Sequence, residues 1–379
     1  MRLGKRPQAG GCMESVACWA LSRAGLATGL RLRDRLAASP WDAPEGAPVA
    51  LCRIFAPARI CDSAEAAPFA RFAAALAQDF RIFRAHVVIG AAGIAVRALA
   101  PLLRHKSADP PVIVLDAAGK YAVSLLSGHW GGGNALARHV ARLLGGEAVI
   151  TTASDGLPGS PPGLDELARA ASLRILDWER LPRVAAALLE GEPVPLNDPA
   201  GCLPEAGAPR FLRGADRARG DIPLVSIHWK HTPPAPDLLR MAAPLLTAGV
   251  GCRRGVDAED IVAAVRQTLA EHGLEPAALA SLATVAEKAA EPGLAEAARR
   301  LGLPLLAYPA PKLAAVPVPH PSEAAGARFG LLPFSVCEGA ALLAAHNARP
   351  HGRALLLAAK TVFRGRVTVA IAVCQGTSQ

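Results

Sequence analysis

Aromatic residues make up only 4% of this 379-residue chain, and none of its 8 cysteines falls in a C-x-x-C pair. The scarcity of aromatics argues against a stacking platform for single-stranded nucleic acid. The cysteine spacing gives no support to a zinc or thioredoxin-like motif, and a disulfide framework is not expected at this chain length. We therefore expect reduced thiols, no metal site and a cytoplasmic protein.

Long apolar runs are missing as well. No uncharged stretch of 18 or more apolar residues occurs, so we expect no membrane span. The first apolar stretch is interrupted by Arg23 and is soon followed by Arg31, Arg33 and Asp34, which makes it a poor secretory signal. The sequence therefore indicates neither a membrane protein nor a secreted one.

Basic residues outnumber acidic ones, with 41 Lys and Arg against 32 Asp and Glu and a formal net charge of +9. Of these 41 residues, 34 are Arg, whose planar guanidinium suits carboxylates and phosphates. No block of five or six basic residues occurs, so the charge does not indicate a nucleic-acid tail. Coding bias can explain the Arg content, but a dispersed positive field also suits an anionic small molecule. We expect such a ligand, with no nucleic acid and no membrane as partners.

Apolar runs alternate with helical patterns over much of the chain, which is typical of layered α/β proteins. We expect two layered α/β/α domains with mostly parallel sheets, at 1–155 and 244–379, joined by a Pro/Gly-rich middle region with a small subdomain at 156–243. The predicted strands are His86–Gly90, Pro111–Asp116, Tyr121–Leu126, Ala148–Thr152, Pro223–Trp229, Leu245–Cys252, Pro304–Tyr308, Ala354–Ala359 and Arg366–Val373. The predicted helices are Gly93–Leu103, Ala135–Leu144, Ala258–His272 and Cys337–His346.

The most distinctive local feature is the Gly-rich loop Ser127–Asn134, between a predicted strand and a predicted helix. Backbone N–H groups at such a turn form an anion site, and Gly lets a ligand approach the backbone closely. The spacing of Gly131, Gly132 and Gly133 fits neither a P-loop nor a dinucleotide fingerprint, so a nucleotide is not indicated. A tight structural turn between the strand and the helix is the alternative.

His129 lies in this loop and is the best single catalytic candidate, because an imidazole can act as acid or base near neutral pH. A structural His that holds the turn is an equally reasonable reading. Asn134 at the end of the loop is a plausible N-cap for the helix that follows.

Acidic residues end two of the predicted strands, Asp116 after one and Asp155 after another. Open α/β sheets place ligands at the carboxyl edge of their strands, although a turn or helix cap explains a lone Asp as well. Lys106, Ser107 and Asp109 form a polar cluster that on its own indicates only a loop.

The second domain has its own candidates. Gly251, Arg253 and Arg254 lie at a predicted strand-to-helix turn, which is a natural carboxylate or phosphate site. Lys288 has an acidic residue three positions further on, so a helical ion pair is its simplest explanation. Glu338 lies near the start of an apolar helix, where an acidic side chain interacts favourably with the helix dipole.

Taken in order along the chain, these motifs resemble the CbiG family of cobalamin biosynthesis. The matching segments are Ala92–Arg97, Ala100–Leu103, Lys106–Pro110, Val112–Asp116, Ser124–Asn134 and Val149–Asp155. The C-terminal part is similar to CobE-type proteins through Gly249–Gly255, Leu282–Thr284, Lys288, Glu291, Val336–Ala341, Lys360 and Val367–Ala370. Two departures are Gly133 and Gly339, where the family more often has Ala; the first loosens the loop slightly without removing its chemistry.

The resemblance implies hydrolysis of cobalt-precorrin-5A in the anaerobic route to cobalamin (vitamin B12). In that family, water opens the δ-lactone formed from a ring A acetate. The carbon C20 then leaves with its methyl as acetaldehyde, and cobalt-precorrin-5B is formed. The substrate carries the cobalt, so the resemblance implies no cofactor and no metal site in the protein.

On this hypothesis the catalytic residues are His129, Asp155 and Lys106, with His129 as acid/base and the loop backbone as an oxyanion or carboxylate cradle. Lys106, Arg253 and Arg254 hold substrate carboxylates, with the macrocycle in a cleft between the two domains. The expected substrate-binding residues are Ser127, Gly128, Gly131, Gly132, Gly133, Asn134, Arg97, Asp116, Gly251, Arg253, Arg254, Lys288 and Glu338.

A non-catalytic tetrapyrrole-binding or hand-over protein of the same pathway is the alternative, and release of acetaldehyde would separate the two. The expected partner is the cobalt-tetrapyrrole substrate. Contacts with other corrin-pathway enzymes stay open.

Overall fold

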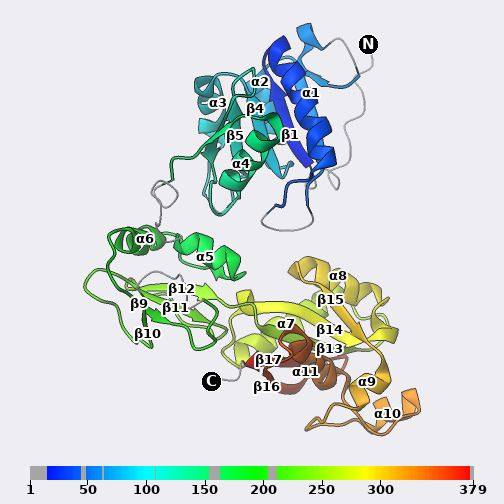
Figure 1. The fold of residues 1–379 in the computed structure, drawn as a ribbon. Coiled ribbons are helices and arrows are strands. Elements are labelled where there is room, and N and C mark those ends of the chain that lie inside the picture. The colour runs from blue at the N-terminus through cyan, green and yellow to red at the C-terminus, as the bar shows by residue number, and fades with distance from the viewer. Residues whose placement is uncertain are drawn as a thin grey trace. The chain divides into compact units, whose positions relative to one another are not determined.

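The computed structural model describes residues 15–43, 48–61, 64–106, 108–152, 163–203 and 211–375. The chain divides into two compact units, residues 1–166 and 167–379 (Figure 1). Asp155 and Ser107 lie outside the described residues. Each unit is considered by itself below.

Among the described residues, the first unit is built on a seven-stranded sheet with strand order β3-β2-β1-β4-β5-β6-β7. The strands are β1 Ser15–Ala20, β2 Leu51–Pro57, β3 Ala67–Phe69, β4 Ala85–Ile89, β5 Val112–Leu115, β6 Tyr121–Leu126 and β7 Glu147–Val149. The helices are α1 Arg23–Ala38, α2 Phe72–Asp79, α3 Ala92–Leu99 and α4 Gly133–Leu144. The strands β1 to β5 are parallel, as the alternating pattern predicts.

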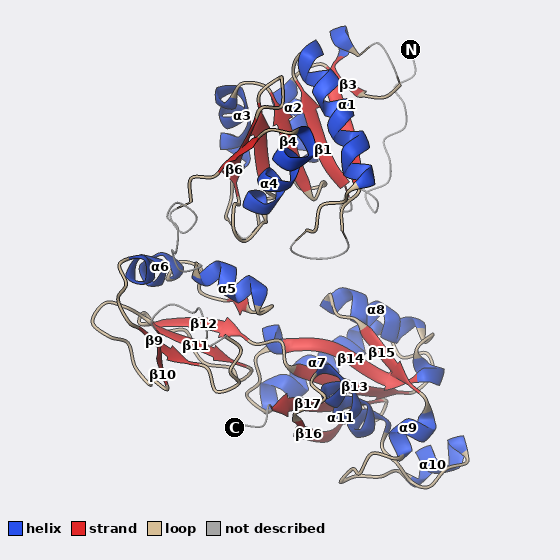
Figure 2. Cartoon of the chain, in the orientation of Figure 1, coloured by secondary structure: helices blue, strands red, loops and turns tan. Residues whose placement is uncertain are grey.

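Helices cover both faces of this sheet. Leu32 of α1 and Leu136 of α4 belong to the core on one face, and Leu76 of α2 and Leu99 of α3 belong to the core on the other. All six residues of β1 are buried, which is typical of a central parallel strand that is covered on both sides. The prediction of a layered α/β/α arrangement is confirmed (Figure 2).

The direction of β6 decides where the Gly-rich loop lies. β6 runs antiparallel to β5, and Leu126 at its end pairs with Val112 at the start of β5. The loop Ser127–Asn134 therefore leaves the sheet at the amino edge of the parallel strands. Asp116 follows β5 at the carboxyl edge, so the sheet separates two features that the sequence analysis assigned to one site.

The middle region is more than a linker, because it forms a sheet with strand order β10-β9-β11-β12-β8 in the part that the structure describes. Its elements are α5 Leu164–Ala170, β8 Arg174–Ile175, α6 Leu181–Leu189, β9 Val194–Asn197, β10 Phe211–Arg213, β11 Leu224–His228 and β12 Leu238–Ala242. Asp177 is buried and accepts hydrogen bonds from the Arg240 backbone N–H, Nε and Nη2 at 2.8–2.9 Å. This pairing fixes β12 to the segment that precedes α6.

The third sheet has the order β15-β14-β13-β17-β16 among the described residues. Its strands are β13 Leu246–Cys252, β14 Leu279–Val285, β15 Leu305–Tyr308, β16 Arg353–Phe363 and β17 Val367–Gln375. Its helices are α7 Ala258–Glu271, α8 Pro292–Leu301, α9 Ala310–Ala314, α10 Glu323–Phe329 and α11 Val336–Ala348. The strands β13, β14 and β15 are parallel to one another. β17 runs antiparallel to both of its neighbours, β13 and β16.

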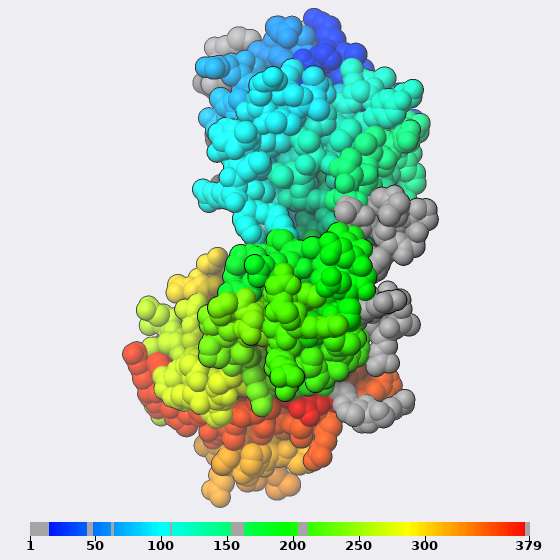
Figure 3. All heavy atoms as spheres, turned by 90° about the vertical axis from the view of Figure 1, so that its left-hand side faces the viewer, coloured from blue at the N-terminus to red at the C-terminus, as the bar shows by residue number. Residues whose placement is uncertain are grey.

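The second unit joins the middle and C-terminal sheets through one shared core. Trp229 and Ala242 of the middle region pack with Leu246 and Leu269 of the C-terminal part. The Trp229 carbonyl accepts a hydrogen bond from the Glu275 N–H at 2.9 Å. Figure 3 shows the surfaces of these two parts in contact within the unit.

Helix α11 packs unusually close to β13. A Cβ at Gly249 would lie 1.8 Å from the Cys337 carbonyl oxygen and 2.7 Å from the Ala341 backbone nitrogen. The facing side of α11 is made of small residues, among them Ala341 and Ala345 in the core with Ala370 of β17. The absence of a side chain at 249 thus sets the depth of the helix, and with it the position of the helix start.

We expect Gly249→Ala to destabilise the second unit by about 3 kcal/mol, because the new methyl must displace helix backbone. Urea unfolding measures the effect. The matched control is Gly339→Ala in α11, where the new Cβ would lie 3.1 Å from the Leu313 carbonyl oxygen and helix propensity offsets the crowding. Equal stability of the two variants would contradict the close-packing explanation.

A buried histidine lies in the core of the first unit. The His86 side chain is 0% exposed; its Nδ1 accepts from Trp19 Nε1 at 3.1 Å and its Nε2 donates to the Phe80 carbonyl at 3.0 Å. Burial lowers the pKa of His86 to about 4, although the Phe80 hydrogen bond acts in the opposite direction. The folded unit therefore holds a neutral imidazole.

We expect the first unit to lose roughly 3 kcal/mol of stability between pH 6.5 and pH 4, because only the unfolded His86 binds a proton in that range. The contribution is complete above pH 6.5 and is lost as the pH falls. His86→Phe should remove the His86 contribution to this dependence in unfolding experiments across the range, while the contribution of His139, whose pKa burial also lowers, remains. His105→Phe, at an exposed position of the same unit, should keep it; loss of the dependence there would refute the assignment.

Candidate functional site

The Gly-rich loop is a turn held together by its own backbone. The N–H groups of Gly133 and Asn134 donate to the Ser127 and Gly128 carbonyls at 3.0 and 2.9 Å, and the Gly132 N–H donates to the His129 carbonyl at 3.1 Å. These three N–H groups are therefore occupied within the loop and are not available to an anion. The cradle expected from the sequence is smaller than the whole loop.

Close contacts explain the glycines of the loop. A Cβ at Gly131 would lie 2.7 Å from the Ser127 Cβ, and one at Gly133 would lie 2.8 Å from the Leu126 carbonyl oxygen. The predicted N-cap is wrong, because Gly132 is the N-cap of α4, in the left-handed region at φ 81°. Asn134 lies in the first turn, and its Nδ2 donates to Thr152 Oγ1 at 3.0 Å.

The Lys106 loop meets the Gly-rich loop at this amino edge. Ser127 Oγ donates to the Asp109 carbonyl at 2.8 Å, while the buried Asp109 carboxylate accepts from Arg81 Nη2 at 3.0 Å and from the Arg104 N–H at 2.8 Å. Lys106 is exposed, and the His129 side chain is 15% exposed. The structure thus brings the loops of two candidate catalytic residues together.

Asp116 and Arg97, two of the expected substrate-binding residues, form hydrogen bonds within their own segments of the chain. The Asp116 carboxylate accepts from the Ala118 and Tyr121 N–H groups at 3.0 and 2.7 Å, which closes the turn between β5 and β6. Burial alone would raise the pKa of this carboxyl group, but the hydrogen bonds outweigh it and lower the pKa. Arg97 is exposed and its Nη1 donates to the Gly93 carbonyl at 3.0 Å.

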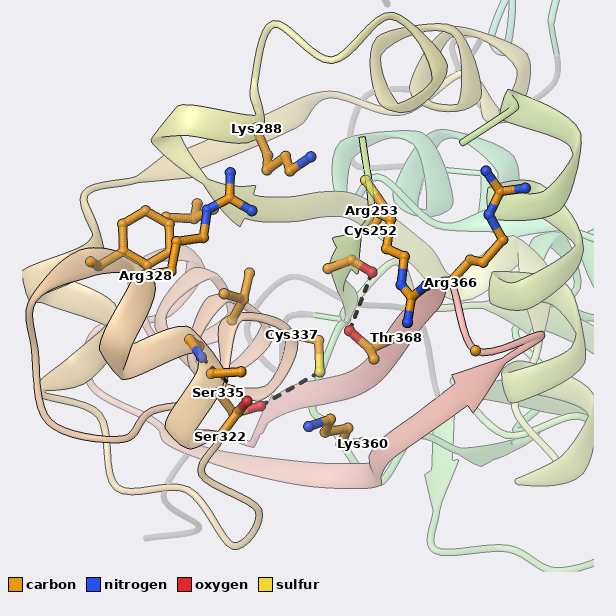
Figure 4. A pocket seen from close by; sticks show the side chains of 17 residues that line it. Cys252, Arg253, Lys288, Ser322, Arg328, Ser335, Cys337, Lys360, Arg366 and Thr368 are labelled. Carbon is orange, nitrogen blue, oxygen red and sulfur yellow. Dashed lines mark hydrogen bonds between the residues drawn. The ribbon is translucent and has the colours of Figure 1, made fainter. Parts of the chain in front are cut away.

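The second unit contains a pocket of about 320 Å³ at the carboxyl ends of β13 and β14 (Figure 4). Parallel strands of open α/β sheets present ligands at this edge. The pocket is lined by Gly251, Cys252, Arg253, Val285, Lys288, Ser322, Ala324, Ala325, Arg328, Phe329, Ser335, Val336, Cys337, Lys360, Gly365, Arg366 and Thr368. Gly251, Arg253 and Lys288 were expected from the sequence, whereas the exposed Arg254 does not line it.

Every charged side chain in this lining is basic. Lys288 and Arg328 lie on one side, Arg253 and Arg366 on the other, and Lys360 below (Figure 4). Lys288 is buried and its Nζ pairs with Glu291 Oε2 at 3.0 Å, while Glu291 also accepts from the Gly255 N–H at 2.6 Å. The arrangement can bind an anion with several charged groups.

Two thiols also line the pocket. Burial raises the pKa of Cys252, although the nearby Lys288 charge acts against it, and burial likewise raises the pKa of Cys337. Both groups are therefore neutral thiols at pH 7, and a neutral thiol is a weak nucleophile. The pocket is suited to binding rather than to covalent catalysis.

Glu338 does not reach a ligand, because its side chain is 0% exposed and lies behind the pocket wall. The sequence analysis also missed Arg328, Lys360 and Arg366 as site residues. They come from α10, β16 and the start of β17, and only the tertiary fold brings them to the ends of β13 and β14. No local pattern in the sequence would have identified Arg328 or Arg366.

Within the described ranges, no cluster of three or more His, Cys, Asp or Glu side chains is placed to hold a metal ion. No described helix is long and apolar enough to cross a membrane.

We expect Asp116→Ala to destabilise the first unit by about 1 kcal/mol, because two N–H groups of the turn lose their acceptor. Asp116→Asn, which keeps one acceptor oxygen, should be intermediate. Urea unfolding at pH 7 measures both, with Asp42→Ala at an exposed position as the control. Unchanged or increased stability of Asp116→Ala would speak for a ligand-binding role instead.

Three family models match the chain: Cobalamin synthesis G N-terminal at 74–155, Cobalamin biosynthesis central region at 162–240 and Cobalamin synthesis G C-terminus at 246–372. A relative from Salmonella typhimurium, named cobalt-precorrin-5A hydrolase, is 33% identical over 261 residues, which cover 64% of this chain and 71% of that protein. One from Priestia megaterium with the same name is 29% identical and covers 70% and 73%. Protein CobE of a Sinorhizobium species is 33% identical over 129 residues, or 34% of this chain and 79% of its own length.

The models follow one another along the chain in the order that the resemblance predicts, and the two longer relatives span both units. The chain therefore belongs to the CbiG family of cobalamin-synthesis hydrolases.

Proposed function

We propose that this protein hydrolyses cobalt-precorrin-5A to cobalt-precorrin-5B and acetaldehyde. The observation that supports this most strongly is the similarity to two proteins named for this hydrolase over 71% and 73% of their own lengths. The basic pocket of the second unit agrees with it, because the substrate is a polycarboxylate.

The reaction needs a base, a stabilising charge and an acid. A base takes a proton from water while the water oxygen bonds to the lactone carbonyl carbon, and the developing oxyanion requires hydrogen-bond donors. The acyl–oxygen bond then breaks, which leaves a carboxylate on ring A and a hydroxyl on C20. Loss of the hydroxyl proton forms the carbonyl of acetaldehyde, and the electron pair of the bond between C20 and the macrocycle returns to the macrocycle.

We assign the acid/base role to His129 and the oxyanion contact to the N–H groups of residues 128–131. The amino edge supports this assignment, because the loop is rigidly closed and the His129 side chain is partly exposed there. Lys106, on the adjoining loop, supplies a positive charge to the lactone carbonyl or to a substrate carboxylate. Asp155, the third catalytic candidate from the sequence, lies outside the described residues and stays a prediction.

A tetrapyrrole-binding or hand-over protein is the second candidate. One observation favours it: the described lining of the basic pocket contains no carboxylate and no imidazole, so this pocket by itself supplies no general base. Binding without release of aldehyde would support that function.

We expect His129→Ala to lower kcat for acetaldehyde release by about 10²- to 10⁴-fold, the usual contribution of general acid–base catalysis, while KM changes little. The assay is anaerobic incubation with cobalt-precorrin-5A and trapping of the volatile aldehyde. His351→Ala, a matched change at an exposed position, is the control and should retain full activity.

Turnover of His129→Ala within a few-fold of the parent would eliminate His129 as the acid/base. A parent protein that binds the pigment tightly without producing aldehyde would instead favour the hand-over function.

A further inference from the structure

We propose that the basic pocket of the second unit is an anchoring site for carboxylate side chains of the tetrapyrrole, separate from the place where the lactone opens. The inference rests on the proposed function for the identity of the ligand. In this proposal the pocket residues bind the ligand, and no step of the reaction takes place in the pocket. Glu338 is a positioning residue.

The pocket carries positive charge that no carboxylate of the described residues neutralises. Arg253, Arg328, Lys360 and Arg366 line the pocket, and none of them forms an ion pair with a carboxylate of the described residues. Four cations around one small space repel each other, so their arrangement raises the energy of the empty pocket. A ligand with more than one carboxylate removes this repulsion, and Arg pairs with carboxylates in a bidentate geometry.

The pocket is too small to enclose a tetrapyrrole. A volume of about 320 Å³ lies at the lower end of the range for pockets that enclose a drug-sized molecule, roughly 300–1,000 Å³. A tetrapyrrole macrocycle with its acidic side chains is far larger than such a molecule. The pocket therefore encloses acetate or propionate arms of the ligand and leaves the macrocycle outside.

The lining of the pocket lacks a general base. The groups that could transfer protons near pH 7 are Asp, Glu and His side chains, and the pocket-lining residues described include none. Lys288 is held by Glu291, and the two thiols are protonated at neutral pH. Lactone hydrolysis needs a base beside the reacting carbon, so the lactone does not open inside this pocket.

The position of Lys360 depends on a buried carboxylate. The ladder between β16 and β17 shifts register between Ala358 and Thr361, and Lys360 lies in this irregular stretch. Its N–H donates to Glu338 Oε1 at 3.0 Å instead of to a strand. Glu338 thus fixes the backbone from which the Lys360 side chain enters the pocket.

The Glu338 carboxylate also positions a second wall of the pocket, the segment that leads to Ser322. Glu338 Oε2 accepts from the His320 N–H at 3.2 Å, and Oε1 accepts from His320 Nδ1 at 2.8 Å. His320 precedes Ser322, which lines the pocket. Burial would raise the pKa of Glu338, but the hydrogen bonds from Lys360 and His320 outweigh it and keep the carboxylate ionised. Three donors converge on this group, so an uncharged amide cannot satisfy all of them.

The test measures KM, kcat and direct binding with cobalt-precorrin-5A and the full-length chain. We expect Arg328→Gln and Lys360→Met each to raise KM and the dissociation constant about tenfold and to leave kcat within twofold, as the loss of one charge-assisted contact predicts. Lys360→Arg should restore most of the affinity. The matched control is Arg299→Gln on the exposed surface of α8, with 74% of its side chain exposed.

Glu338→Gln tests the positioning role. We expect a rise in KM at least as large as that of Lys360→Met, and a less than additive rise when the two changes are combined, because Glu338 acts partly through the Lys360 ammonium group and partly through the Ser322 wall. Additive effects would show that Glu338 acts on binding by a route other than Lys360. Circular dichroism and thermal unfolding identify variants that fail to fold, and the Arg328→Gln result does not depend on Glu338.

The outcomes separate the two proposals. A loss of kcat at unchanged KM in the pocket variants would mean that the lactone reacts in the pocket, and unchanged kinetics and binding would mean that the pocket holds no part of the ligand; either result overturns the anchoring site. If the parent protein binds the pigment, releases no aldehyde and loses affinity in the same variants, the anchoring site stands and the hydrolase proposal fails.

Discussion

Helix α11 can lie as deep as it does against β13 only because residue 249 has no side chain, and this packing determines the geometry of the basic pocket. The helix begins at Val336, beside the carboxyl ends of β13 and β14, and its first turn provides both a pocket wall and Glu338. The buried carboxylate then fixes Lys360 and the segment before Ser322. A small-residue interface in the core thus controls the placement of charged side chains around the pocket.

The candidate sites of the two units differ in their chemistry. The first unit has a closed, rigid loop with a partly exposed imidazole, and the second has cations with almost no acid–base chemistry. Lactone hydrolysis requires both, since a large polyanion must be held while one acyl carbon meets water.

Periodicity predicted nine of the 17 strands and four of the 11 α-helices of the described residues, because apolar runs such as 86–89, 246–252 and 367–373 are largely buried in a sheet. It could not predict the antiparallel direction of β6, which moves the Gly-rich loop to the amino edge and away from Asp116. It also could not find Arg328, Lys360 and Arg366, since α10 and the β16–β17 hairpin reach the ends of β13 and β14 only in the folded unit. The sequence indicated Glu338 as a substrate-binding candidate, but in the structure its carboxylate is buried and accepts hydrogen bonds from the Lys360 and His320 N–H groups. A sequence does not show that a carboxylate is buried.

The most direct test of lactone hydrolysis is a single turnover in H₂¹⁸O followed by mass spectrometry of the pigment. Attack of water on the lactone carbonyl predicts that the product pigment gains one labelled oxygen, in the new ring A carboxylate, in step with the release of acetaldehyde. A product pigment without label would contradict hydrolysis at the acyl carbon, and label that appears without aldehyde would contradict the loss of C20 as acetaldehyde.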